Sequence, residues 1–559
     1  MPVLSNLLQF KLDYLNGFIS LAILVFFVLI TLYSLKFMRA RPRRFEYYLW
    51  MVLTAIASVG AVLANNLILL LILWGFLGLT LYLLINLGDE ASDKTAKKTF
   101  IIVGASDSLM LLGIVIIYHL TGTFQMDKIQ LAVGSSQLAM LAFICLAIAA
   151  FAKAGAMPFH SWIPDCAEHA PLPVVAFLPA SLDKLLGIYL LARVCLNLFV
   201  MNQAMNIFLM LIGAFTILAA VMMAMVQHNL KRLLGYHAVS QVGYMVLGIG
   251  TGNPIGIAGG IFHMLNHAVY KSCLFLTGGN IESKTNTSEL DKLGGLGKLM
   301  PLTYFACLVA SFSISGVPPF NGFVSKWMVY QGLVAKLNDT GLALRFTSIL
   351  CLVAAMIGSA LTLASFMKLI HATFLGQRLG DSASERVREV NWTMWLPCLI
   401  LAGICVLFGI FAFAIPLKYF VLPALTGSHA LPASGFLGFW SPGVATLLII
   451  AGLIIGLVVF KLGRLSLSFR EDAPYIGGEP GVLEKSKVSG TEFYNTVKEI
   501  NILSRFYKLA EEKCFDIYDV GQRIVFGING VLRHLHNGVL PTYLVWCLLG
   551  MMVMFFVLK

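Results

Sequence analysis

Four lysines lie within apolar stretches long enough to cross a membrane: Lys153, Lys184, Lys271 and Lys326. A charged side chain at mid-membrane costs about 3 kcal/mol on insertion scales, so such residues usually face protein or water and serve a function. Burial favours the neutral amine, and a neighbouring carboxylate favours the ammonium form. A row of these lysines can therefore relay protons by switching between the two forms. The alternative for any one of them is a lysine at a helix end whose ammonium reaches the membrane surface.

His263, His267 and Lys271 recur every four residues, which places them on one stripe of a single helix. Histidine titrates near neutral pH, so this stripe is typical of a proton relay. Two histidines at this spacing can also hold zinc, but no glutamate stands beside the first one and no third ligand is near. A hydrogen-bonded histidine pair without a function is the remaining alternative.

Asp107 and Asp183 are the carboxylates that lie well inside predicted spans, and they are possible acidic partners of the lysines. Asp183 and Lys184 are adjacent, so they point in different directions from one helix and need not face each other. Lys368 and His371 lie near the end of a predicted span, where we expect them to extend to the membrane surface.

The composition is that of a membrane protein. Of 559 residues, 59% are hydrophobic and 12% are charged, against about 25% charged in soluble domains. The net charge of +12 does not indicate nucleic acid, because the basic residues gather in alternate loops as the positive-inside rule requires. The ten cysteines occur without a CxxC pair, so we expect them to serve packing and expect no iron–sulfur cluster in this chain. We likewise expect no metal, no cofactor and no redox or hydrolytic site in it.

An all-α polytopic fold with about fourteen transmembrane helices is predicted, since roughly 20 apolar residues cross the hydrocarbon layer. The predicted spans are residues 14–36, 46–64, 67–87, 99–119, 136–156, 173–196, 206–227, 232–250, 255–278, 300–337, 344–375, 393–415, 441–461 and 540–557.

Two of these spans are interrupted, one at residues 153–158 and the other at residues 316–319. Interrupted helices are tolerated in a membrane where they are buried in protein or line water. Each is the fourth member of a set of five spans, so the two sets form an inverted repeat whose interruptions indicate the transport site.

The charge pattern predicts the orientation. The basic connection at residues 36–44 must be cytoplasmic, which places the N-terminus outside and residues 377–389 inside. We retain the first span as part of the protein, because no cleavage site follows it. The predicted domains are a first span and basic loop (1–45), a first five-helix repeat (46–196), a second, inverted repeat (206–375), two further spans (393–461) and a lateral segment with a terminal span (462–559).

Residues 488–536 predict a C-terminal amphipathic helix, because apolar residues recur at helical spacing beside a charged face. Such a helix lies along the membrane surface on the cytoplasmic side, before the last span. The alternative is a cytoplasmic tail that packs on the rest of the same chain.

Four stretches resemble one family. They are FAKAGAMPFHSWIPD at residues 151–165, NLKRLLGYHAVSQVGY at 229–244, HMLNHAVYKSCLFL at 263–276 and GVPPFNGFVSK at 316–326. In combination they resemble the antiporter-like membrane subunits of respiratory complex I, of Mrp sodium/proton antiporters and of energy-converting membrane-bound hydrogenases. The resemblance covers about residues 10–415. The 488–557 tail resembles the larger members, whose lateral helix clamps neighbouring subunits.

The resemblance implies a role for each residue of the row. Lys153 resembles the central lysine beside the first broken helix, and Lys184 the connecting lysine of the following helix. His263, His267 and Lys271 resemble the central bridge, and Lys326 resembles the terminal lysine at the second break.

The same resemblance implies the partners. In the family, oxidoreduction in an attached peripheral arm drives protons or sodium ions through this row. Partners are therefore expected to be other membrane subunits, peripheral redox subunits that carry iron–sulfur clusters and flavin or nickel, and the lipids of a bacterial or archaeal cytoplasmic membrane. Nucleic acid is not expected. The runner-up function is that of one subunit in an Mrp-type cation/proton antiporter.

Two departures from the family pattern stand out. By its motifs the chain begins at the family's third span, with residues 10–15. Gly75 also occupies the place of the glutamate that normally pairs with the Lys153-type lysine. Another acid, most plausibly Asp107, or one from a neighbouring subunit must then approach Lys153. Otherwise the protein is a non-conducting structural scaffold.

Overall fold

The computed structural model describes residues 8–338, 341–376, 387–425, 440–462, 491 and 494–558. The chain forms one unit from Met1 to Glu499 and a second from Ile500 to Lys559. The helices of the first half are α2 (Tyr14–Phe37), α3 (Arg44–Leu63), α4 (Leu67–Ile85), α5 (Ser92–Thr121), α6 (Gln137–Ala154), α7 (Trp162–His169), α8 (Leu172–Phe177), α9 (Asp183–Arg193) and α10 (Gln203–Met225). They are followed by α11 (Leu230–Gly250), α12 (Pro254–Thr285), α13 (Pro301–Ser315), α14 (Asn321–Ala335), α15 (Leu342–Ile370), α17 (Trp392–Ile410), α18 (Pro442–Leu462), α19 (Asn495–Glu499), α20 (Asn501–Glu511), α21 (Ile517–Leu535) and α22 (Leu540–Val557).

Shorter elements join these helices. The two-residue strands β1 (Leu131–Ala132) and β2 (Phe199–Val200) pair in parallel. Short 3₁₀ turns are η1 (Met126–Lys128), η4 (Leu290–Lys292), η5 (Leu296–Lys298), η6 (Lys336–Asn338) and η9 (Pro423–Leu425), and π-helical segments are η2 (Leu178–Leu182), η3 (Val194–Leu198), η7 (His371–Leu375) and η8 (Phe413–Val421).

Among the described residues, 11 helical stretches are long and apolar enough to cross a membrane. They are α2 to α6, the continuous stretch Leu172–Leu198, α10, the stretch Leu342–Leu375, α17, α18 and α22. These confirm the prediction of an all-α polytopic membrane protein, and their ends lie within a few residues of the predicted ones except at α5, which begins earlier. The three remaining predicted spans correspond to α11, α12 and the pair α13 and α14, which do not meet that criterion. Residues 377–386, which the predicted orientation used, lie outside the described residues.

Both predicted interruptions are present, and they share a backbone conformation. α6 ends before Gly155 with φ +80°, and α13 ends before Gly316 with φ +79°. In each break the next N–H bonds back five residues, from Ala156 to the Phe151 carbonyl at 2.9 Å and from Val317 to the Phe312 carbonyl at 3.0 Å. Glycine is needed at both positions, because an L-residue with a side chain rarely adopts this φ.

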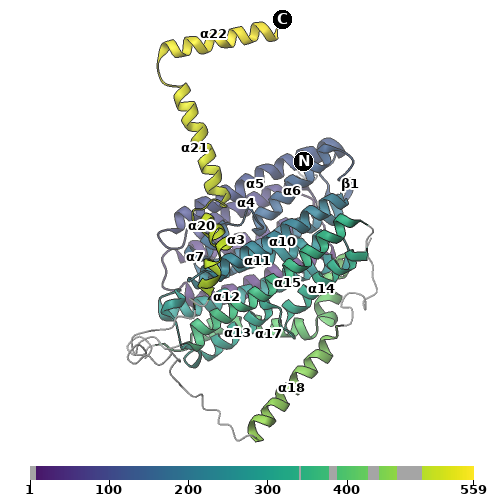
Figure 1. Ribbon diagram of the computed structural model, residues 1–559, viewed down its shortest axis with the longest axis vertical. Coiled ribbons are helices and arrows are strands. Elements are labelled where there is room, and N and C mark those ends of the chain that lie inside the picture. Colours follow the sequence, from purple (N-terminus) through teal and green to yellow (C-terminus); the bar gives the residue numbers. More distant parts are fainter. Residues whose placement is uncertain are drawn as a thin grey trace. The chain divides into compact units, whose positions relative to one another are not determined.

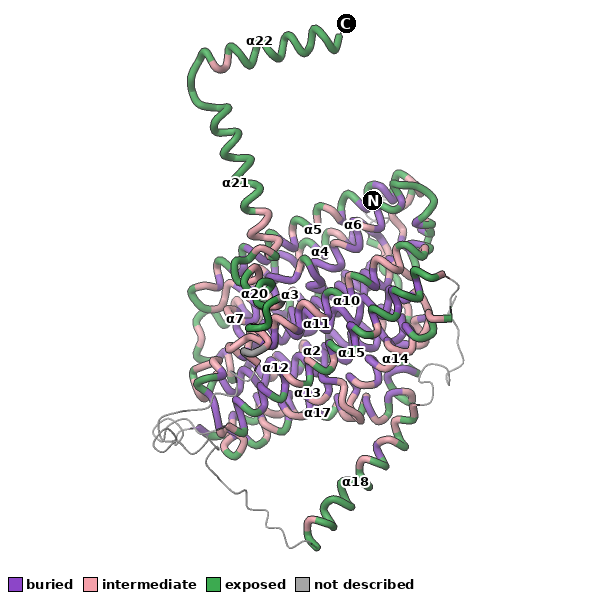
Figure 2. Tube along the Cα trace, viewed as in Figure 1, coloured by how far each residue is buried: buried purple, intermediate pink, exposed green. Residues whose placement is uncertain are grey.

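α12 forms the centre of the first unit. It is buried without interruption from Gly256 to Ile281 and packs against α8, α11, α13, α14 and α17. Figure 1 shows α10, α11, α12 and α15 side by side, and of these α11 and α12 are buried over most of their lengths (Figure 2). A helix buried on every side excludes lipid, so polar side chains on α12 face other helices.

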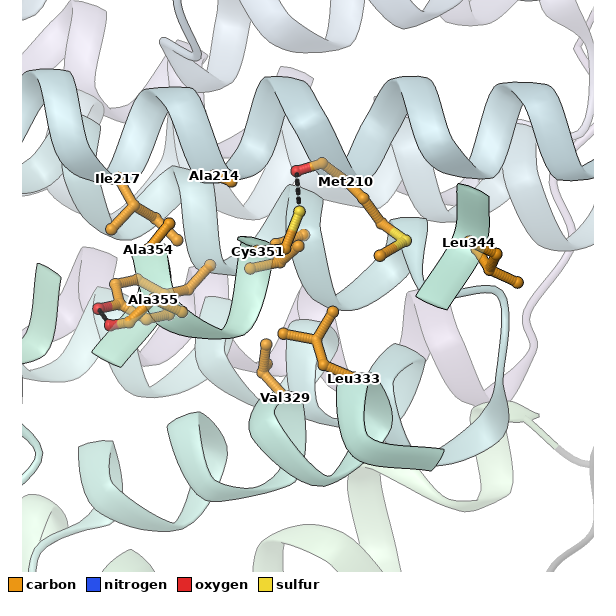
Figure 3. Packing of buried hydrophobic residues seen from close by; sticks show 11 residues of the cluster. Met210, Ala214, Ile217, Val329, Leu333, Leu344, Cys351, Ala354 and Ala355 are labelled. Atoms are coloured by element: carbon orange, nitrogen blue, oxygen red, sulfur yellow. Dashed lines mark hydrogen bonds between the residues drawn. The ribbon is translucent and has the colours of Figure 1, made fainter. Parts of the chain in front are cut away.

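Small residues let these helices approach closely. A Cβ on Gly213 of α10 would lie 2.6 Å from the Leu247 nitrogen of α11, and one on Gly358 of α15 would lie 2.2 Å from Ile217. Close approach through glycine is the usual packing mode between membrane helices. The apolar cluster where α10, α11, α14 and α15 meet is shown in Figure 3, and it comprises Met210, Ala214, Ile217, Tyr244, Leu247, Val329, Leu333, Leu344, Cys351, Ala354 and Ala355.

The predicted amphipathic segment is not one helix. Its described part forms α19, α20 and α21, and α20 and α21 are separated by a turn in which Lys513 has φ +57°. A positive φ cannot continue an α-helix, so α21 starts a new one at the Asp516 cap. Residues 488–490 and 492–493 of the predicted segment lie outside the described residues.

Candidate ion pathway

The first break holds a buried ion pair. Lys153 Nζ lies 3.6 Å from Asp183 Oδ1, and each side chain is 1% exposed. The Trp74 ring centroid is 5.6 Å from the same ammonium. Lys184 Nζ lies 5.6 Å from the Trp162 ring centroid and forms no hydrogen bond with the described residues. Two cations and one carboxylate are therefore enclosed together, each cation against an indole face.

The π-helical segment η2 positions these groups. It joins α8 to α9, and the Ser181 hydroxyl inside it donates to the carbonyls of Ala176 and Phe177. A π-helical insertion rotates the following residues about the helix axis, and such insertions are frequent at functional sites. Asp183 then faces Lys153, while Lys184 turns toward Trp162.

Asp183, not Asp107, is the carboxylate within ion-pair distance of Lys153 in the described structure. The expectation that Asp107 is the most plausible substitute for the missing glutamate is corrected on this point. Asp107 on α5 does interact electrostatically with Lys153. Gly75 is exposed, and a Cβ there would meet no atom within 4 Å. The position of the missing glutamate therefore opens onto the surface of the chain, beside buried Trp74.

His263 of α12 faces α11 and α14, whereas His267 lies near the backbone of η2. His263 Nδ1 lies 2.9 Å from the Ser325 hydroxyl, and its Nε2 lies 3.2 Å from both Gln241 Oε1 and the Tyr270 hydroxyl. His267 has no hydrogen bond of normal geometry within the described residues, although the Ala180 backbone is near. The two histidines are therefore differently held: His263 is fixed on both ring nitrogens, and His267 is not.

The remaining lysines bond to backbone. Lys271 Nζ donates to the Leu234 carbonyl at 2.7 Å, and Lys326 Nζ donates to the Ile314 carbonyl at 2.8 Å. The Tyr244 ring centroid is 4.7 Å from Lys326 Nζ. Since α13 ends at the second break, its Ile314 carbonyl is one that the helix itself leaves unpaired. A lysine at this point satisfies a carbonyl that the interruption exposes.

The six residues predicted as a relay come together in one electrostatic series. Asp183 interacts with Lys153 and Lys184, and Lys184 interacts with His267 and Lys271. The series continues from His267 to His263 and from His263 to Lys326. All six predicted residues, which are Lys153, Lys184, His263, His267, Lys271 and Lys326, are at most 2% exposed. Titratable groups in such a series can exchange protons between neighbours.

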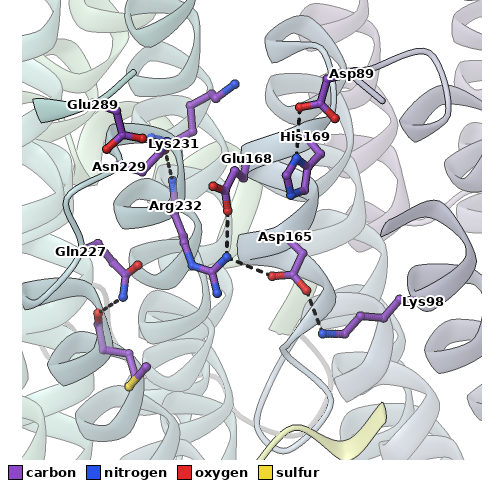
Figure 4. Close-up of polar contacts among 11 residues, drawn as sticks. Asp89, Lys98, Asp165, Glu168, His169, Gln227, Asn229, Lys231, Arg232 and Glu289 are labelled. Atoms are coloured by element: carbon purple, nitrogen blue, oxygen red, sulfur yellow. Dashed lines mark hydrogen bonds and ion pairs between the residues drawn. The ribbon is translucent and has the colours of Figure 1, made fainter. Parts of the chain in front are cut away.

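Ion pairs fix the second half of the first broken helix (Figure 4). Asp165 of α7 accepts from Lys98 of α5 at 2.8 Å and lies 3.3 Å from Arg232 of α11. Glu168 of α7 accepts from the same guanidinium at 2.8 Å. α7 is thereby tied to α5 and α11, which holds the break beside Lys153 and Lys184. Within the described part of the chain, no group of three or more His, Cys, Asp or Glu is placed to hold a metal ion.

The model of one protein family, NADH:quinone oxidoreductase/Mrp antiporter, TM, matches residues 64–366, more than half of the chain. The chain belongs to this family. The match contains all four motifs, so it confirms the resemblance drawn from them.

Curated relatives come from two kinds of complex. The chain is 30% identical over 465 residues to a Na(+)/H(+) antiporter subunit of Bacillus subtilis, covering 79% of this chain and 57% of the relative. It is 31% identical over 401 residues to a Na(+)/H(+) antiporter subunit of Staphylococcus epidermidis, covering 68% and 50%. It is 30% identical over 422 residues to hydrogenase-4 component B of Escherichia coli, covering 72% and 62%. The chain thus spans between half and two thirds of these relatives' lengths.

Solved structures share the fold. One chain of the membrane-bound sulfane sulfur reductase, an archaeal respiratory membrane complex, matches 99% of this chain and 90% of its own length with a TM-score of 0.80 and 22% identity. One chain of the Mrp complex from Dietzia sp. matches 77% and 84% with a TM-score of 0.67 and 20% identity. The fold of the first of these chains is therefore shared over nearly the whole of this chain.

The structure places polar residues in the site that the sequence analysis did not single out. His237 and Gln241 of α11 and Asn266 and Asn321 near the second break are all fully buried. The spacing of His237, Gln241 and Tyr244 on one face of an apolar span was the signal that could have found the first two. Polar residues confined to one face of a membrane helix face protein, not lipid.

Lys368 corrects a second expectation. Its side chain is enclosed by protein and does not extend away from it: the residue is 4% exposed, and Nζ donates to the carbonyls of Met225 at 2.5 Å and Gln227 at 3.0 Å. These carbonyls lie at the C-terminal end of α10, where unpaired acceptors attract a cation. His371, three residues later, is exposed.

Proposed function

We propose that the chain is the proton- or sodium-translocating, antiporter-like membrane subunit of a multi-subunit redox complex of complex I or energy-converting hydrogenase type. The observation that carries this proposal is the series of buried titratable groups from Lys153 to Lys326. Keeping four lysines inside an apolar protein is costly, and a purely structural protein has no use for them. The family membership supports the same function.

The two breaks support an inverted repeat. In this proposal the two five-helix sets are α3 to α9 and α10 to α15. When α11, α12 and the pair α13 and α14 of the second set are each counted as one crossing, the chain crosses the membrane fourteen times. Residues 1–45, 46–196, 206–375, 393–461 and 462–559 are then the successive domains. The N-terminus lies outside, and residues 462–536 lie on the cytoplasmic side of a bacterial or archaeal cytoplasmic membrane. Matching glycines at the ends of α6 and α13 are the supporting observation.

The partners follow from the same proposal. Other membrane subunits cover the exposed helices, and a peripheral arm holds iron–sulfur clusters with flavin or nickel. The names of the relatives, a hydrogenase component and antiporter subunits, agree with a protein that works inside a larger assembly.

Membership of an Mrp-type cation/proton antiporter is the second candidate. It is favoured by the sequence identity to the Na(+)/H(+) antiporter subunits, which is as high as the identity to the hydrogenase-4 component. A non-conducting scaffold is the third candidate, and it rests on Gly75. The Lys153–Asp183 pair speaks against the scaffold, because it supplies the acid that a conducting Lys153 needs.

Co-purification distinguishes the first two candidates. Subunits with iron–sulfur clusters and nickel or flavin that purify with the tagged chain support the redox complex, and small hydrophobic partners without redox groups support the antiporter. Ion movement into inverted membrane vesicles then tests translocation, driven by the electron donor or by added sodium ions. We expect Lys153→Ala and Lys326→Ala to impair it while the complex still assembles, and Lys128→Ala, at an exposed site, to leave it unchanged. Unimpaired movement in both buried variants would exclude this chain as a pathway.

A further inference from the structure

His237 and Lys368 are two of the buried titratable residues that lie outside the series from Lys153 to Lys326. His237 on α11 is fully buried, and Lys368 on α15 is 4% exposed. Buried cationic residues are rare inside membrane domains unless they serve a function. Their positions relative to the series and to the protein surface indicate what that function is.

His237 lies next to the series. Its ring packs 4.8 Å from the Phe366 ring, and Lys271 Nζ lies 5.7 Å from the same ring. Lys271 also donates to the carbonyl of Leu234, one helical turn before His237. The charges that act on His237 are those of Lys271, Lys326 and Lys368. His237 therefore lies beside Lys271, and the charge of Lys326 also acts on it.

Lys368 links His237 to the surface. Ser365, one turn before it on α15, has its hydroxyl 2.8 Å from His237 Nε2. On its other side, Lys368 interacts electrostatically with Asp291 of η4. Asp291 is about 40% exposed, and its Oδ2 lies 2.9 Å from Nδ1 of the equally exposed His228. Titratable groups thus succeed one another from solvent to the core.

Further groups line the outer end of this succession. Lys368 donates to the carbonyl of Gln227, whose side chain is drawn at the end of α10 in Figure 4. The Thr491 hydroxyl donates to Asp291 Oδ1, and the Tyr494 hydroxyl donates to the Ala364 carbonyl at 3.0 Å. The end of α10, the loop after α12 and the segment before α20 therefore meet at this point of the surface.

We propose that Asp291, Lys368 and His237 form a proton branch that connects the surface at η4 with the Lys271–Lys326 half of the series. This proposal rests on the proposed function, and it specifies that the transported ion is the proton. A proton taken up at the Asp291–His228 pair reaches the Lys368 amine, and the Lys368 ammonium gives a proton through the Ser365 hydroxyl to the His237 ring. His237 releases the proton at its other nitrogen to the neutral amine of Lys271, so every proton gained is passed on.

The chemistry of the branch selects protons over sodium ions. Sodium is held by anionic and carbonyl oxygens, and the inner members of this branch are a lysine and a histidine that carry positive charge or none. The carbonyls of Met225 and Gln227 are already occupied by the Lys368 ammonium. A sodium ion entering here would meet a cation, whereas a proton is the species that these two groups exchange.

The test uses the complex purified through the full-length chain, with proton movement measured in inverted vesicles. His237→Gln keeps a hydrogen-bonding group toward Ser365 but cannot titrate. Lys368→Arg keeps the cation at the end of α10, but arginine does not release its proton. Both complexes are expected to assemble, and proton movement is expected to fall about tenfold or more. His371→Gln, the same substitution at an exposed histidine one turn beyond Lys368, is expected to change nothing.

Two outcomes separate this proposal from the proposed function. If His237→Gln and Lys368→Arg retain full proton movement while Lys326→Ala loses it, the branch is wrong and the translocating function stands. If Lys153→Ala and Lys326→Ala also retain full movement, both the function and the branch are wrong. Loss of proton movement in His237→Gln and Lys368→Arg, with His371→Gln unchanged, supports the branch.

Discussion

The two broken helices carry the same backbone geometry and different charge environments. At each break a glycine with φ near +80° ends the helix, and a buried lysine lies beside it. Lys153 has a carboxylate, Asp183, at 3.6 Å. Lys326 bonds to the Ile314 carbonyl and lies over Tyr244, with no carboxylate of the described residues within ion-pair distance.

This difference teaches that a shared interruption does not imply a shared electrostatic role. A buried ion pair is held together because removing one member leaves the other charge uncompensated. A lysine held only by a carbonyl and a ring face can lose its charge without leaving a partner exposed. At the first break, the paired charges of Lys153 and Asp183 are therefore needed for the stability of the fold. At the second break, Lys326 can change its charge without leaving a counter-charge unpaired.

The largest expected effect is on the first break. Asp183→Asn leaves Lys153 as an unpaired buried cation, and we expect a loss of about 3–5 kcal/mol of stability. Lys153→Met should lose a similar amount, since it leaves Asp183 unpaired. The double variant Lys153→Met with Asp183→Asn should recover much of that loss. The apparent melting temperature of the purified complex measures all three, and an unchanged value for Asp183→Asn would show that the pair does not stabilise the fold.

The glycines of the two breaks give the next largest effect. Replacing either glycine by alanine should destabilise the folded protein by about 1–2 kcal/mol, because the left-handed backbone is strained for L-residues. Gly155→Ala should cost more than Gly316→Ala, since its Cβ would lie 1.9 Å from Ile163 Cδ1, against 3.1 Å from the flexible Lys326 side chain for Gly316. The yield and melting temperature of the two complexes test this order. Equal losses would mean that Ile163 moves aside freely.

Much of this comparison could be predicted from the sequence, and the reasons are local. Helix positions followed from apolar runs, and both breaks followed from Gly and Pro in otherwise helical spans. The stripe His263, His267 and Lys271 followed from helical spacing alone. The family was recognised from four motifs that lie within the matched residues.

The partners of these residues could not be predicted, because they depend on helix rotation and on contacts distant in sequence. Asp183 faces Lys153 since η2 rotates α9, and no spacing rule anticipates a π-helical insertion. Lys368 is bonded to the end of α10, 141 residues or more away in sequence. The separation of α20 from α21 depends on one positive φ at Lys513, a residue without a turn signal of its own.

Lys326→Met tests the second break and should have a smaller effect on stability than any change at the first. The substitution removes a buried cation without leaving an unpaired charge among the described residues, so we expect stability within about 1 kcal/mol of the unchanged protein. Ion movement in vesicles should nevertheless be lost. A destabilisation equal to that of Lys153→Met would show that Lys326 also has a counter-charge, and the contrast between the breaks would disappear.

The smallest effect is expected where charge lies outside the series, at a surface cavity of about 110 Å³ near the end of α9. Lys11 pairs there with Asp127 at 3.1 Å, and both side chains are at least a third exposed. Burial alone would raise the pKa of Asp127, but hydrogen bonds from Lys11 and Asn65 outweigh it and lower that pKa below its ordinary value. A carboxyl group whose pKa is lowered by folding stabilises the folded state at pH values above its ordinary pKa, which is about 4. This contribution is lost as the pH falls through the lowered pKa. Exposed pairs are worth about 0–1 kcal/mol, so Lys11→Ala should shift the melting temperature slightly at pH 7 and not at all near pH 2. An equal shift of the melting temperature at both pH values would show that Lys11 acts through packing. A loss of stability as large as that of Asp183→Asn would show that exposure does not decide which ion pairs stabilise this chain.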